Sequence, residues 1–119
     1  MEKISNLQLS GIIKIPEGRL EEFKQIATEC TKLVRRKDNE TLKYDCFLSS
    51  DQTECEIREE YKSSEAVIKH VMNLGETLQK LLNDFPPERF AVYGDPSPHL
   101  LEILKGVDAK FYSFFQGLE

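Results

Sequence analysis

The order of hydrophobic periods along this chain of 119 residues is the feature that most restricts its fold. Apolar residues alternate with polar ones over 6–15, 41–49 and 54–61, and this period of two predicts strands with one buried face. Over 18–36, and again in the region that begins at Ser63, apolar residues recur every three or four positions. That longer period predicts amphipathic helices between and after the strands.

The rest of the chain continues the same alternation of elements. Gly75 is expected to interrupt the second helical region, and a short strand over 89–93 follows it. Beyond that strand, Ser97-Pro98 and Gly106 are typical start and stop signals of a short helix. A last strand is predicted over 109–116. We interpret the basic triplet 35–37 as a favourable charge at a helix C-terminus rather than as a binding patch.

The order β-α-β-β-α-β matches the ferredoxin-like split β-α-β unit. We therefore predict one α+β domain over 1–119, with an antiparallel sheet and helices on one face only. The other face needs a cover, and the last strand carries aromatic residues on both sides. Phe111 and Phe115 lie on one side, and Tyr112 and Phe114 on the other. A homodimer with this C-terminal segment at its interface is expected; the alternative is a monomer whose last strand folds back on its own sheet.

Composition excludes several classes of protein. With 16 basic and 21 acidic residues the net charge is −5, which argues against a nucleic-acid-binding protein. No segment has the apolar length of a membrane span, and residues 1–4 lack the blocks of a signal peptide, so we expect a cytoplasmic protein. Cys30, Cys46 and Cys55 have no metal-binding spacing, and they are expected to be free, buried thiols.

One segment carries a resemblance to a known family. Residues 59–70 read Glu-Glu-Tyr-Lys-Ser-Ser-Glu-Ala-Val-Ile-Lys-His: a strand end, a serine turn, and a helix with a histidine in its second turn. This segment resembles the antibiotic biosynthesis monooxygenase family. Residues 17–23 resemble the start of that family's first helix, and 41–44 resemble its second strand. The likeness covers about 7–93, so that 94–119 form a C-terminal extension.

The resemblance implies a dimeric α/β barrel with a pocket between sheet and helices. Some members of the family oxidise quinols or aromatic phenols with molecular oxygen, without a metal or flavin, so no cofactor is expected. Other members degrade haem with an Asn, a Trp and a His. Because this chain has no Trp, haem degradation is not expected, even though Asn6 and His70 are present.

His70 and Glu59 are the candidate catalytic residues. His70 lies three residues after Val67 and four before Leu74, so it falls on or beside the buried stripe of its helix. An imidazole there can accept a proton from a phenol or quinol, or it can simply fix the helix to the sheet. By strand alternation Glu59 faces inward and needs a partner. His70 is one candidate, and Glu59 would then orient its ring; Arg58 and Arg89 are others.

Tyr44 and Tyr61 are candidate walls of a substrate pocket, since aromatic rings stack on planar ligands, although both also fit a hydrophobic core. Together these residues predict a cofactor-independent monooxygenase that oxidises a small aromatic quinol or phenol. The alternative from another class is a non-catalytic dimer on the same fold that binds a small ligand or is associated with stress. A third reading is a purely structural dimer with a filled interior.

Overall fold

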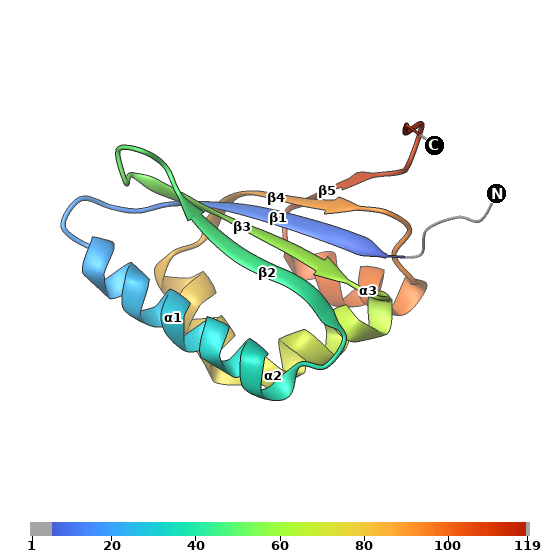
Figure 1. The fold of residues 1–119 in the computed structure, drawn as a ribbon, viewed down its shortest axis with the longest axis horizontal. Helices are drawn as coiled ribbons and strands as arrows, with labels where there is room; N and C mark the ends of the chain where they lie inside the picture. Colours follow the sequence, from blue (N-terminus) through green and yellow to red (C-terminus); the bar gives the residue numbers. More distant parts are fainter. Residues whose placement is uncertain (1–5, 119) are drawn as a thin grey trace.

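The computed structural model describes residues 6–118 and has the predicted order of elements (Figure 1). The strands and helices are β1 (Leu7–Lys14), α1 (Leu20–Lys37), β2 (Thr41–Leu48), β3 (Glu54–Tyr61), α2 (Ser64–Asp84), β4 (Pro87–Tyr93), α3 (Pro98–Ile103) and β5 (Ala109–Tyr112). A single 3₁₀ turn, Leu104–Gly106, extends α3. The ends of the strands and helices lie within two or three residues of the expected positions, except for the end of the last strand.

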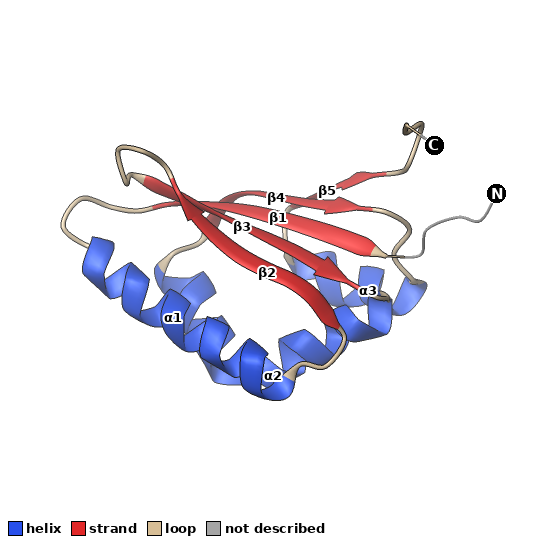
Figure 2. Ribbon diagram, in the orientation of Figure 1, coloured by secondary structure: helices blue, strands red, loops and turns tan. Residues whose placement is uncertain are grey.

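The strands form one sheet in the order β2-β3-β1-β4-β5. β1 pairs antiparallel with β3 and β4, and β2 pairs antiparallel with β3. β5 departs from this pattern, because it lies parallel to β4. All the helices cover the same face of the sheet, as Figure 2 shows. The α+β, ferredoxin-like fold is thus confirmed, and the sheet of the single chain is open rather than closed into a barrel.

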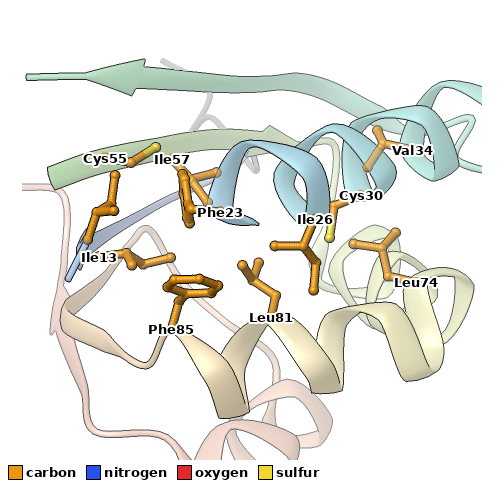
Figure 3. Packing of buried hydrophobic residues seen from close by; sticks show 11 residues of the cluster. Ile13, Phe23, Ile26, Cys30, Val34, Cys55, Ile57, Leu74, Leu81 and Phe85 are labelled. Carbon is orange, nitrogen blue, oxygen red and sulfur yellow. The ribbon is translucent and has the colours of Figure 1, made fainter. Parts of the chain in front are cut away.

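Two clusters of buried side chains lie between the sheet and the helices. The first cluster joins α1 and the second half of α2 to β1 and β3 (Figure 3). At its centre, the Phe23 and Phe85 rings meet edge to face, with their centroids 5.3 Å apart. The second cluster joins the first half of α2 and α3 to the other end of the sheet, and Tyr61 is its largest fully buried residue. The candidate site lies beside this residue.

The helices begin and end where their local chemistry favours it. Ser63 caps α2, its side-chain oxygen accepting a hydrogen bond from the Ala66 amide at 3.2 Å, and Ser97 caps α3 in the same way through Leu100 at 3.1 Å. Gly75 interrupts α2 as predicted, with φ of +48° and ψ of −123°. The resulting kink divides α2 into two halves. Ala66, Val67 and Ile68 at its start pack in the second cluster, whereas Leu74, just before the kink, and Leu81, after it, pack in the first.

Three local expectations were wrong. The last strand ends at Tyr112 rather than at 116, so Phe114 and Phe115 lie beyond it and are exposed in the single chain. The β2–β3 register shifts between Thr41 and Lys43, and this bulge leaves Leu42 exposed on an edge strand expected to bury it. Cys46 of β2 is exposed as well, whereas Cys30 and Cys55 are buried as expected.

Candidate functional site

The centre of the candidate site is a hydrogen bond between two side chains that joins the end of α1 to α2. Asp38 is the residue at which α1 ends, and its Oδ2 atom lies 2.8 Å from Nδ1 of His70. Both side chains are almost fully buried, at 3% and 5% exposure. A buried carboxylate is costly unless it is hydrogen-bonded, so this contact fixes the position of the imidazole ring.

Two further donors complete the environment of Asp38. Asn73 donates to Oδ1 at 2.7 Å, and the Thr41 hydroxyl donates to Oδ2 at 2.7 Å. Burial by itself would raise the pKa of Asp38, but the hydrogen bonds from Asn73, Thr41 and His70 outweigh it and lower that pKa below its ordinary value. Asp38 is therefore ionised at neutral pH, where it can only accept hydrogen bonds.

The ionised state of Asp38 determines the tautomer of the histidine. Because a carboxylate cannot donate, Nδ1 of His70 must carry the hydrogen, and in the neutral ring Nε2 is then an acceptor. Within residues 6–118 no hydrogen bond reaches Nε2, and no fully buried side-chain nitrogen or oxygen of those residues lacks a partner. In the neutral ring, Nε2 is therefore the atom that can accept a proton.

Two tyrosine rings flank the imidazole. The ring centroid of His70 lies 5.4 Å from that of Tyr44 and 5.3 Å from that of Tyr61. Tyr61 is fully buried and Tyr44 is half-buried. Burial, followed by the nearby Glu59 charge, raises the pKa of both phenols, so both hydroxyls stay protonated. Both predicted wall residues are thus brought to His70, and both also pack in or against the buried clusters.

Glu59 is paired differently from the expectation. Its Oε1 atom accepts a hydrogen bond from the Tyr61 hydroxyl two residues along the same strand. Burial raises the pKa of Glu59, and the nearby His70 and the Tyr61 hydrogen bond oppose this rise without cancelling it. The prediction that Glu59 orients His70 was wrong, because Asp38 occupies that position, and neither arginine proposed as a partner for Glu59 is bonded to it within the described chain.

Sequence reasoning missed Asp38 and Asn73. Asp38 is separated from His70 by 32 residues and follows a basic triplet that looked like an ordinary helix end. Asn73 had a usable signal, since it lies three residues after His70 and therefore shares its helix face. No spacing in the sequence indicates that the end of α1 lies against this face of α2.

Two surface hollows lie at the sheet. One, of about 350 Å³, runs between α1 and β2, and the other, of about 310 Å³, lies over β1 and β3 with Glu59 in its wall. His70, Tyr44 and Tyr61 line neither hollow. Among residues 6–118, no three His, Cys, Asp or Glu side chains are placed to hold a metal ion. No helix in that range is both long and apolar enough to cross a membrane.

Solved structures with the same architecture are numerous. MupZ from Pseudomonas fluorescens superimposes with a TM-score of 0.88 at 19% identity, over 100% of this chain and 92% of MupZ. A protein from Nitrosomonas europaea, provisionally named an antibiotic biosynthesis monooxygenase, gives 0.65 at 16% identity, over 82% of this chain and 97% of its own. A protein from Bacteroides thetaiotaomicron with the same provisional name gives 0.61 at 19% identity, over 79% and 90%.

The fold is that of the antibiotic biosynthesis monooxygenases. The likeness that the sequence showed over 7–93 is thereby confirmed at the level of architecture. MupZ extends the agreement to the whole chain, including the C-terminal helix and strand. Neither the protein-family models nor the curated proteins give a match. At these identities the antibiotic biosynthesis monooxygenase architecture is what the comparisons share with this chain, and its chemistry must be argued from the site.

Proposed function

We propose that this protein is a cofactor-independent monooxygenase that oxidises a small aromatic quinol or phenol with molecular oxygen. The observation that carries the proposal is the buried pair of Asp38 and His70, in which the carboxylate holds the ring through Nδ1 and no described residue is hydrogen-bonded to Nε2. The Tyr44 and Tyr61 rings on either side are suited to a planar substrate. Structural neighbours that are provisionally named monooxygenases support the same class of reaction.

In this reaction His70 acts as the general base. Nε2 accepts the proton of a substrate hydroxyl, and Asp38 stabilises the imidazolium that forms. The resulting phenolate transfers an electron to oxygen far more readily than the phenol does. A quinol and one molecule of oxygen then give a hydroxyquinone and one molecule of water, so the substrate itself supplies all the electrons. Glu59, whose pKa is raised by burial, accepts the hydrogen bond of the Tyr61 hydroxyl beside the ring.

Oxygen uptake by the metal-free protein tests the proposal, with a panel of reduced quinones and polycyclic phenols as substrates. We expect His70→Gln to lower the rate about 10²- to 10⁴-fold, the usual contribution of a general base. Asp38→Asn should lower it less, because the ring is still present but its tautomer is no longer fixed. His99→Gln is the matched control, since His99 lies exposed on α3. An unchanged rate in His70→Gln would refute the role of base.

A second candidate function is supported by the position of the two hollows. Because neither hollow is lined by His70, the network of His70, Asp38 and Asn73 also fits a purely architectural role that ties α2 to the end of α1. In that case the protein is a non-catalytic dimer that binds a small ligand or is associated with stress. It would bind reduced quinones without oxygen uptake, and His70→Gln would lower the free energy of unfolding while leaving that binding intact.

We propose in addition that the protein forms a homodimer. Beyond β5 the chain leaves the sheet on the side opposite the helices, as Figure 1 shows. There Phe114, Phe115 and Leu118 are 73%, 91% and 104% exposed. Apolar side chains this exposed favour a partner surface, and a second copy facing the open sheet would cover them. Such a dimer would also enclose the hollow over β1 and β3.

A further inference from the structure

The hollow between α1 and β2, which we name the α1–β2 groove, is separate from the His70 cluster. α1 and β2 run side by side along one edge of the molecule (Figure 1). The apolar part of the groove is formed by Phe23 and Ala27 of α1, Leu48 of β2 and Cys55 of β3. Its volume of about 350 Å³ falls at the lower end of the range of small-molecule sites, about 300–1,000 Å³.

The charge of the groove is opposite to that of the whole chain. Every charged residue that lines it is basic, namely Lys24, Lys32 and Arg35, although acidic residues outnumber basic ones, 21 to 16, in the protein. Lys24 is 3.8 Å from Glu21 and is thus partly neutralised. Lys32 and Arg35 have no carboxylate within 4 Å in the described part of the chain. They lie three residues apart on one helix face, so their cationic groups are neighbours.

We propose that the α1–β2 groove binds an amphipathic carboxylate, with its aliphatic chain along the apolar part and its carboxylate at Lys32 and Arg35. Arg35 is suited to this ligand because a guanidinium can bind a carboxylate with two parallel hydrogen bonds. From Lys24 to Arg35 the groove follows α1 for about 16 Å, at 1.5 Å per residue, so a chain of medium length fits along it. The binding site is independent of the proposed oxidation.

Cys46 provides an internal reporter of occupancy. It lines the groove and is exposed, whereas Cys30 and Cys55 are buried. A hydrogen bond with Cys55 lowers the pKa of Cys46, while burial raises the pKa of Cys30 to about 11. Cys46 should therefore react first with a neutral alkylating reagent, and a ligand lying in the groove should shield it.

The experiment measures the alkylation rate of Cys46 by N-ethylmaleimide, with mass spectrometry to identify the modified thiol. The probes are decanoate, decanol and decyltrimethylammonium, each below its micelle-forming concentration. We expect decanoate to slow the alkylation in a saturable way and to bind at least tenfold more tightly than the other probes. In Lys32→Gln/Arg35→Gln the affinity for decanoate should fall about tenfold, the combined effect of two exposed ion pairs.

Arg36→Gln/Lys37→Gln is the matched control, because these exposed residues belong to the same helix and carry the same charge but do not line the groove. An equal loss of affinity in the control would show general attraction to a basic helix end and would overturn the proposal. Equal protection by all three probes, or none by decanoate, would overturn it too. The proposal would also be overturned if a second copy of the chain occupied the groove. In that case Ala27→Arg, which places a large charged side chain in the groove lining, would convert a dimer into monomers in sedimentation experiments.

Discussion

Two carboxyl groups near His70 have pKa values displaced in opposite directions. Three hydrogen bonds keep Asp38 ionised, while burial favours the protonated form of Glu59. Environments that separate the pKa values of neighbouring groups are typical of sites that handle protons. Here Asp38 holds the His70 ring through Nδ1, and Glu59 lies beside the two tyrosines, bonded to Tyr61 and paired with Tyr44 across the strands.

The raised pKa of Glu59 makes a prediction about stability and pH. A group whose pKa is higher in the folded than in the unfolded state contributes stability below its unfolded pKa, and that contribution is lost as the pH rises through the folded pKa. The ordinary value is 4.5, so the free energy of unfolding of the wild type should decline as the pH rises above it. Glu59→Gln removes this ionisation, and it should be the more stable protein at pH 7.

Urea denaturation of both proteins from pH 4 to pH 8 measures this difference. Only the difference between the two curves is informative, since other groups titrate in both proteins. Glu60→Gln is the matched control, because Glu60 is the next residue on β3 and belongs to the opposite face. If the difference in free energy of unfolding between wild type and Glu59→Gln became smaller as the pH rises, the pKa of Glu59 would not be raised in the folded protein.

The residues of the site were predictable to different degrees. His70, Tyr44 and Tyr61 were found because helix and strand periods determine which side chains face inward. The partners were not found, because pairing depends on how the ends of elements meet. Asp38 lies at the end of α1, where the residues before it are basic and exposed, and only the packing of that end against α2 brings it to His70 and Asn73.

At the scale of elements, the kink in α2 allows one helix to contribute buried side chains to both hydrophobic clusters. Its first half places Val67, His70 and Leu74 beneath the sheet, and its second half places Leu81 against α1. The sequence predicted this break through Gly75. It did not predict the bulge at the start of β2, because no glycine or proline marks it and an edge strand has a neighbour on one side only.

Gly75→Ala tests the importance of the kink. The φ of +48° and ψ of −123° are unfavourable for any residue with a Cβ atom, and an added Cβ at this position would meet no other atom within 4 Å. The cost is therefore one of backbone conformation, and we expect the free energy of unfolding to fall by about 1–3 kcal/mol. Chemical denaturation with circular dichroism measures it.

Gly106→Ala is the control for that measurement. An added Cβ at Gly106 would likewise meet nothing within 4 Å, but this glycine is not among those with positive φ in the described chain. Its substitution should change the stability by less than about 0.5 kcal/mol, as is usual for exposed sites. Equal losses in the two variants would show that the conformation of Gly75 is not the cause.

At the scale of the whole molecule, the open face of the sheet is the surface that the proposed homodimer would cover. That face is not the continuous apolar surface that the strand pattern suggested, since β2 and β3 present charged residues there, among them Arg58, which is exposed. The apolar surface is concentrated at β5 and the segment after it, where Tyr93 and Tyr112 stack at 5.0 Å. In the proposed dimer we therefore expect the aromatic edge to supply most of the stability, and the charged strands the specificity.

Phe114→Ser/Phe115→Ser tests this arrangement. Burying a phenylalanine side chain contributes about 1.5–3 kcal/mol, and a twofold dimer would lose two copies of each ring, so the dissociation constant should rise at least about 100-fold. Analytical ultracentrifugation should show the wild type at twice the chain mass of 13.8 kDa and the variant at the chain mass itself. Met72→Ser is the control, because Met72 is 73% exposed and belongs to α2, a helix that covers the opposite face of the sheet (Figure 2). A monomeric wild type, or a variant that remains dimeric with unchanged circular dichroism, would place the aromatic segment outside any interface between copies.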